Sequence, residues 1–155
     1  MKGRGNNTAI QVQPGLYDHD FYAWTQRTAR LLRAGRFERI DVENVAVEIE
    51  DMGKRDLKEL HSRMEVLLMH LLKWRLQPRK QTRSWQTTIL TQRLAIGYLV
   101  RQSPSLRPKL FSELSDVYRS AVKLAITETG LRPDRFPAQC PFTIEQILDE
   151  DFLPA

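Results

Sequence analysis

The sequence of 155 residues contains a single cysteine, Cys140, which excludes an intramolecular disulfide and a zinc site built from cysteines alone. No apolar run approaches the roughly 20 residues that a membrane-spanning helix needs, so we expect no membrane association. The first fifteen residues have no apolar segment of the kind found in secretory signals, and we therefore expect a cytoplasmic protein. Alternating patterns typical of strands are short and lie inside helical patterns.

The charged residues are unevenly distributed, although the net charge is only +5. Residues 1–40 carry 7 basic and 3 acidic side chains, and residues 41–60 carry 3 basic and 7 acidic ones. Residues 61–110 carry 10 basic and 1 acidic side chain, and residues 111–155 carry 4 basic and 8 acidic ones. Blocks of opposite sign can neutralise one another within one fold or between two copies, and the basic block can attract nucleic acid or an acidic partner.

Apolar residues at helical spacing predict four main helices, at about 18–34, 41–75, 85–102 and 106–129, and a short C-terminal helix at about 144–150. Either Asp18 or Asp20 is expected to cap the first of them. Residues 1–15 are polar and non-periodic, which predicts a flexible tail before a single helical domain over 16–155. Four amphipathic helices with short connections predict an all-α bundle. Gly35 and Gly130 are expected to end helices, whereas Gly53 either bends or ends the long second helix.

Two apolar stripes are expected to face the core. In the long helix the stripe is interrupted only by Asp56 and comprises Val45, Ile49, Met52, Leu60, Met64, Leu67, Leu71 and Trp74. In the third helix Trp85, Ile89, Ile96 and Leu99 are in register, and the stripe is widened by Leu90, Leu94 and Tyr98.

The motifs of common active sites are absent. No Glu-x-x-His or His-Glu-x-x-His pattern is present, so no helical metal site is predicted. Cys140 lies in a proline-rich loop without an adjacent base, and no glycine-rich phosphate loop occurs. We therefore predict no catalytic residue, no metal and no cofactor, and we regard an enzyme as the weakest interpretation.

A basic segment at 73–83 is the clearest candidate for binding. It contains Lys73, Arg75, Arg79, Lys80 and Arg83. Trp74 and Trp85 flank it, and this combination suits single-stranded nucleic acid. The alternative is that both tryptophans anchor the core and the charges only keep a loop solvated.

Several segments resemble a bacterial family, the domain of unknown function 29, in order over about residues 16–154. They are 16–25 (LYDHDFYAWT), 31–37 (LLRAGRF), 48–53 (EIEDMG), 70–74 (HLLKW), 83–85 (RSW), 104–106 (PSL), 128–131 (ETGL) and 140–150 (CPFTIEQILDE). The resemblance implies an all-helical fold and brings no established activity, cofactor or partner. Among the matching residues, Asp20, Glu50, Asp51 and His70 are polar and hardest to explain as core, which makes them a second candidate site. A buried His70 paired with Glu50 or with an aspartate of the first helix is the structural alternative.

The sequence thus favours a protein-interaction or small regulatory module. Its partner is another protein or a second copy, because a helix longer than its neighbours exposes an end that a second copy can cover. The alternatives are a nucleic-acid-binding protein that uses the 73–83 segment and, more weakly, an enzyme or metal-binding protein that uses Glu50, Asp51 and His70.

Overall fold

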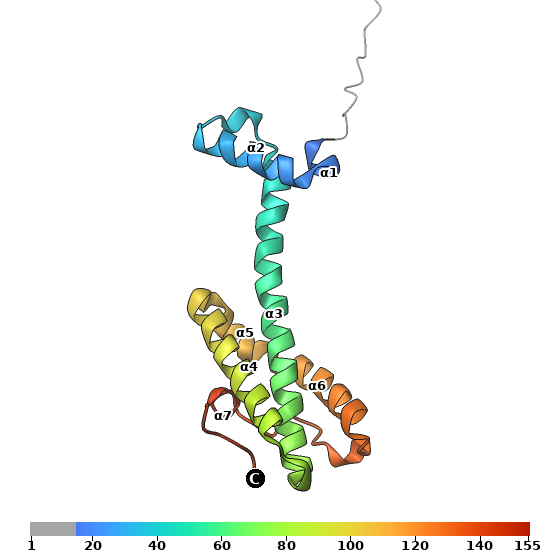
Figure 1. Cartoon of the computed structure of the whole chain (residues 1–155). Helices are drawn as coiled ribbons and strands as arrows, with labels where there is room; N and C mark the ends of the chain where they lie inside the picture. The colour runs from blue at the N-terminus through green and yellow to red at the C-terminus, as the bar shows by residue number, and fades with distance from the viewer. Residues whose placement is uncertain (1–14) are drawn as a thin grey trace, which may run out of the picture. The chain divides into compact units, whose positions relative to one another are not determined.

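A computed structural model describes residues 15–155 of the chain. Its helices are α1 (Leu16–His19), α2 (Phe21–Arg33), α3 (Val42–Leu76), α4 (Arg83–Gln102), α5 (Arg107–Ser112), α6 (Leu114–Thr129) and α7 (Ile144–Leu148). Single 3-10 turns η1 (Phe37–Arg39), η2 (Pro78–Lys80), η3 (Pro104–Leu106) and η4 (Pro133–Arg135) occupy the connections. No strand occurs in residues 15–155, and the predicted all-α fold class is confirmed (Figure 1). The predicted tail lies outside the described residues, apart from Gly15.

The chain divides into two compact units, Met1–Asp51 and Met52–Ala155. The described part of the first unit contains α1, α2, η1 and the beginning of α3. The second unit contains the rest of α3 and everything after it. The prediction of a single domain over residues 16–155 stays a prediction.

The first unit is organised around Trp24. The indole is buried and contacts the rings of Tyr17 and Phe21, with centroids 4.9 and 5.6 Å away. Tyr17 also joins α1 to α3, because its hydroxyl donates to Glu48 Oε1 at 2.8 Å. Trp24 and Thr28 are the only buried residues among those described in this unit, so its core is very small.

The helix predicted at 18–34 is wrong in one respect, because the structure divides it at Asp20 into α1 and α2. The backbone of Asp20 is non-helical (φ −151°, ψ 82°), and its carboxylate accepts a hydrogen bond from the Ala23 amide at 2.9 Å. This is the N-cap geometry that satisfies one of the free amides at the start of a helix. Asp20 therefore starts α2 and interrupts the segment that precedes it.

Helix α3 does not end at Gly53. A Cβ atom at this position would meet nothing within 4 Å, so no neighbour within the described residues requires a glycine there. The ordinary helical backbone of the long run accommodates Gly53, at a cost of about 1 kcal/mol relative to alanine.

The core of the second unit is formed where α4, α6 and α7 surround the later part of α3 (Figure 1). From Leu60 to Leu72, the residues on the core face of α3 are fully buried. Residues of α4 and α7 in the same core are fully buried as well. The fully buried large side chains are Leu60, Met64, Leu67, Leu68, Leu71, Leu72, Ile89, Ile96 and Ile147. The predicted stripe of α3 therefore does form a core over residues 60–71.

The remaining helix boundaries differ modestly from those predicted. Helix α4 begins at Arg83, earlier than expected, because the Thr82 hydroxyl accepts from the Trp85 amide at 3.2 Å. The helix predicted at 106–129 is divided at Glu113 into α5 and α6, and α7 ends at Leu148. Two glycine caps are confirmed: Gly35 and Gly130 have φ of 66° and 67°, the left-handed conformation that glycine adopts without strain.

Candidate functional site

The first residue of the predicted basic segment, Lys73, has a structural role. Its side chain is buried, forms an ion pair and hydrogen bond with Glu128 of α6, and lies 4.5 Å from the centre of the Trp85 ring. A buried ammonium group needs such partners, and both are supplied by other helices of the same unit. Lys73 therefore joins α3, α4 and α6 and is not accessible to a ligand.

The other four cations of the segment are exposed. Arg75 lies in the last turn of α3, Arg79 and Lys80 lie in η2, and Arg83 begins α4. None of these four forms an ion pair with another described residue. The turn that carries them is held by Gln81, whose side-chain amide donates to the Trp74 carbonyl at 3.1 Å. The structure thus keeps a compact group of four exposed cations at the α3–α4 turn.

Both tryptophans of this segment are half-buried. Trp74 packs against the core of the second unit. The ring of Trp85 is engaged by Lys73. These positions match the core-anchor interpretation more closely than that of free stacking platforms.

The four polar candidates belong to different units. Asp20, Glu50 and Asp51 lie in the first unit, where Asp20 caps α2 and Glu50 is exposed. His70 lies in the second unit, half-buried, with Nδ1 2.8 Å from the Val66 carbonyl oxygen. Burial lowers the pKa of His70, and nearby Lys73 lowers it further, whereas the Val66 carbonyl and Glu128 oppose the shift. A lowered pKa keeps His70 neutral near pH 7, as a hydrogen-bond donor to its own helix.

Cys140 is half-buried, and its thiol donates to the Phe142 carbonyl at 3.5 Å. Burial raises the pKa of this thiol, an effect that the hydrogen bond with Phe142 only partly offsets. A raised pKa leaves little thiolate at neutral pH, and the thiolate is the reactive form. No group of three or more His, Cys, Asp or Glu side chains with metal-binding geometry occurs between residues 15 and 155.

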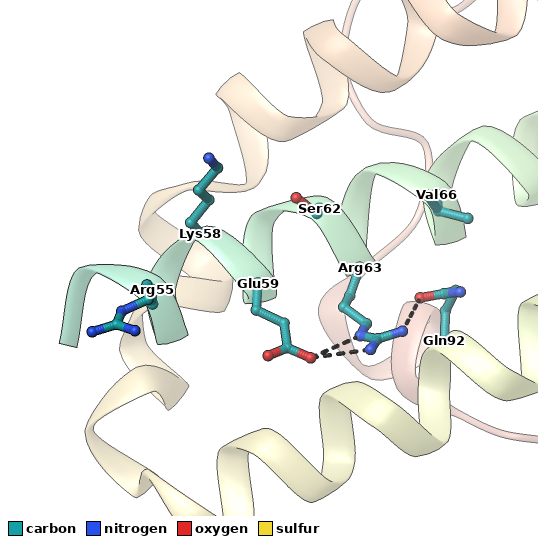
Figure 2. Close-up of a pocket in the computed structure, with 7 residues that line it drawn as sticks. All are labelled: Arg55, Lys58, Glu59, Ser62, Arg63, Val66 and Gln92. Atoms are coloured by element: carbon teal, nitrogen blue, oxygen red, sulfur yellow. Dashed lines mark hydrogen bonds and ion pairs between the residues drawn. The ribbon is translucent and has the colours of Figure 1, made fainter. Parts of the chain in front are cut away.

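A polar pocket of about 450 Å³ lies beside α3 and α4 (Figure 2). Its lining consists of Arg55, Lys58, Glu59, Ser62, Arg63, Val66 and Gln92. Glu59 accepts from Arg63 at 3.0 and 3.2 Å, and Arg63 also donates to Gln92 at 3.4 Å. The Glu59 carboxylate is therefore paired with the Arg63 guanidinium. The lining contains no cysteine or histidine.

Arg93 is a buried cation that the sequence analysis did not single out. It lies on the core face of α4 and donates to the carbonyls of Ile147 at 2.8 Å, Gln146 at 3.2 Å and Glu150 at 3.4 Å. These carbonyls are at the end of α7, where helical partners run out. The spacing gave a signal, because Arg93 follows Ile89 by four residues and precedes Ile96 by three.

Three apolar residues of α4 point away from the core. Leu90, Leu94 and Tyr98, which we call the α4 stripe, recur every four residues and are 41%, 51% and 61% exposed. The prediction that they widen the buried stripe is therefore wrong. The core accommodates only the face that carries Ile89, Arg93 and Ile96.

A second exposed apolar face lies at the start of α3, in the first unit. Val42, Val45 and Ile49, which we call the α3 stripe, share one side of the helix. Val42 and Ile49 are 67% and 64% exposed, and Val45 is half-buried. The expectation that this part of the long stripe faces a core is therefore also wrong.

The family comparison agrees with the resemblance seen in the sequence. No helix in the described part of the chain is long and apolar enough to cross a membrane. No curated protein and no solved structure matches the chain. The model of one family, the domain of unknown function DUF29, matches residues 16–153. The chain therefore belongs to the DUF29 family.

Proposed function

We propose that this protein is a non-catalytic protein-interaction module that docks a partner on the α4 stripe. The observation that carries the proposal is the exposure of three large apolar side chains in a line along a helix whose opposite face is fully buried. Large apolar side chains scattered singly on a surface are ordinary, but a continuous row marks a contact site. The proposal includes the bacterial and cytoplasmic setting expected from the sequence.

Covering the stripe contributes measurably to the affinity of a contact. Covering Leu90, Leu94 and Tyr98 completely removes about half of each side chain from water. At about 25 cal/mol per Å² this gains roughly 1 kcal/mol per residue, or about 3 kcal/mol for the row. That contribution alone corresponds to a change in Kd of about 100-fold.

The non-catalytic part of the proposal is supported by the contacts that three of the candidate residues make within their own units. Asp20 caps a helix, Lys73 is paired with Glu128, and His70 bonds to the carbonyl of Val66. Each group is accounted for by a contact that stabilises its own unit. Cys140, the one thiol, has a raised pKa.

A photocrosslinking amino acid at position 94 tests the docking surface. The full-length protein is produced in its own cells with a benzophenone side chain at position 94, and adducts are identified by mass spectrometry. The matched control carries the same group at position 124, because Leu124 on α6 is also exposed, at 42%. We expect a specific adduct at position 94 and none at position 124. Equal or absent labelling at both positions would refute the proposal.

Binding of single-stranded nucleic acid is a second candidate function. It is favoured by the four exposed cations at the α3–α4 turn, Arg75, Arg79, Lys80 and Arg83, which have no acidic partner among the described residues. Arginine binds phosphate through paired hydrogen bonds, and four such contacts make affinity strongly dependent on salt.

Fluorescence anisotropy with labelled single-stranded RNA and duplex DNA separates this candidate from the first. If all four cations contact phosphates of a single strand, affinity falls roughly 50-fold between about 50 and about 200 mM salt. Replacing the four residues with alanine is expected to abolish binding, while Arg119→Ala, at an exposed site on α6, leaves it unchanged. No binding at low salt rules out this function.

A further inference from the structure

We infer that the partner on the α4 stripe is a second copy of this chain, which contributes its α3 stripe. This inference rests on the proposed function, because it identifies the occupant of the docking surface. Each copy offers both surfaces, so the dimer that we infer has two identical contacts, each between the α3 stripe of one copy and the α4 stripe of the other.

The described part of the first unit buries little apolar surface. Trp24 and Thr28 are its only buried residues within the described range, whereas large apolar side chains remain exposed on α2, η1 and α3. A small unit with so little core usually needs a further surface to cover it. The α3 stripe is an apolar face of this unit on the first turns of α3.

The α3 stripe and the α4 stripe have similar lengths. Val42 and Ile49 are seven residues apart, which spans about 10 Å along a helix, and Leu90 and Tyr98 are eight apart, which spans about 12 Å. The α3 stripe repeats at three- and four-residue intervals and the α4 stripe at four-residue intervals, as on helices that pack with interlocking side chains. The two stripes therefore present apolar rows of similar size.

The charges beside the two stripes favour a contact between α3 and α4 over a contact between two α3 stripes. Glu43 and Glu50 flank the α3 stripe, two helical turns apart, and both are exposed. Two α3 stripes facing each other would bring these carboxylates against their own kind. Helix α4 contains no acidic residue, and the exposed Arg83 and Arg101 lie beyond the two ends of its stripe. An acidic apolar helix and a basic apolar helix are complementary.

The basic character is strongest at the Arg101 end. At the other end, Glu150 and Asp151 line a cavity of about 150 Å³ together with Leu90. We therefore place the carboxylates of the partner copy's α3 nearer to Arg101 than to Leu90. This orientation distinguishes the contact from a non-specific apolar association.

Reciprocal charge reversal tests the inference. One variant carries Glu43→Lys and Glu50→Lys, and the other carries Arg101→Glu, at the end of α4 where the inferred contact places the carboxylates. Sedimentation equilibrium over about 1 to 100 µM reports the mass of each protein. We expect wild type to dimerise and each variant alone to dimerise at least about tenfold more weakly, because both of its contacts then join like charges.

Mixing the two variants provides the decisive measurement. In the mixed pair, the lysines of one chain face the introduced glutamate of the other at one contact. The native Glu43 and Glu50 face the native Arg101 at the second. We therefore expect an equimolar mixture to regain the dimer. The matched control, Lys80→Glu, also reverses one exposed cation of the same unit but lies outside the stripe, and it should dimerise like wild type.

Each alternative outcome has a separate meaning. Wild type that stays monomeric, or variants that dimerise normally, overturn the second-copy inference. In that case an adduct between position 94 and a different protein leaves the proposed function standing, whereas the absence of any adduct overturns both. Crosslinking of a mixture of isotopically light and heavy chains gives a result that does not depend on the charge variants. We expect position 94 of one copy to be joined to residues 42–50 of the other, and a link within one chain would refute the contact.

Discussion

Replacing Arg93 with methionine is predicted to destabilise the second unit more than any surface substitution. Methionine retains most of the length of the side chain but removes its donors, so the carbonyls of Ile147, Gln146 and Glu150 lose a partner in a buried site. The bonds to Ile147 and Gln146, at 2.8 and 3.2 Å, are of normal length, whereas the 3.4 Å contact is weak.

The magnitude follows from these two bonds. Hydrogen bonds to charged groups contribute about 1.5–3 kcal/mol each, and removing the cation recovers part of its desolvation cost. A net loss of about 3 kcal/mol is therefore expected for Arg93→Met. The second unit has roughly 100 residues, and at about 2.1 cal/mol/K per residue this loss lowers Tm by about 14 °C. Arg93→Lys should lose less, about 1–2 kcal/mol, because one ammonium group cannot span the same carbonyls.

Urea unfolding followed by far-ultraviolet circular dichroism measures these differences, and hydrogen exchange locates them. Amides of α7 should exchange faster in Arg93→Met before the rest of the unit does, because the substitution frees the end of that helix. Arg119→Met is the matched control, since Arg119 is an exposed arginine paired with Asp116 on α6, and it should change stability by less than about 0.5 kcal/mol. An Arg93→Met protein as stable as this control would refute the assignment of Arg93 as the residue that holds α7.

Three further predictions concern single residues. Gly53→Ala should raise the free energy of unfolding by up to about 1 kcal/mol, since the added methyl meets nothing within 4 Å. Gly130→Ala should lower it by about 1 kcal/mol, because φ at this position is 67°. Chemical unfolding measures both changes, and changes of the same sign would contradict the reasoning. Burial lowers the pKa of His70 in the folded protein below its ordinary value of 6.5. As the pH falls, the unfolded chain therefore binds this proton before the folded protein does. Stability should fall as the pH drops below about 6.5, and it should fall less steeply in His70→Gln. Alkylation of Cys140 should have a pH midpoint above that of a cysteine peptide, because burial raises the pKa of the thiol, and a lower midpoint would indicate an activated cysteine.

Much of the fold is predictable from local sequence because its signals are local. Gly35 and Gly130 end helices through their own conformational freedom, and the Thr143–Gln146 capping box starts α7 within four residues. The choice between the two cap candidates, Asp18 and Asp20, is also a local event, but it depends on a competition. The carboxylate of Asp20 can cap a helix or remain in one, and the periodic apolar pattern does not decide between these states.

The candidate site was less predictable because its contacts are distant in sequence. Lys73 reads as one of five solvated cations until the fold brings Glu128, 55 residues away, against its ammonium group. Arg93 likewise depends on carbonyls more than 50 residues further along. Periodicity identifies the helix and its face, but only the tertiary structure assigns partners to a charge on that face.

The apolar stripe of α3 shows why pattern alone leaves function open. From Val45 to Trp74 the sequence repeats apolar residues on one face, interrupted only by Asp56, and this single interruption does not show that the part at Leu60 becomes core while the part at Ile49 stays exposed. Exposing an apolar side chain to water is unfavourable in either part of the helix. The apolar residue at Ile49 is therefore explained either by a partner that covers it or by chance. The two explanations differ in their consequence for Ile49→Asp. If a second copy covers Ile49, the substitution weakens dimerisation and lowers stability at high protein concentration only; if nothing covers it, neither quantity changes. Comparing Tm with and without dilution therefore measures whether α3 uses one apolar face for two purposes, folding at one end and assembly at the other.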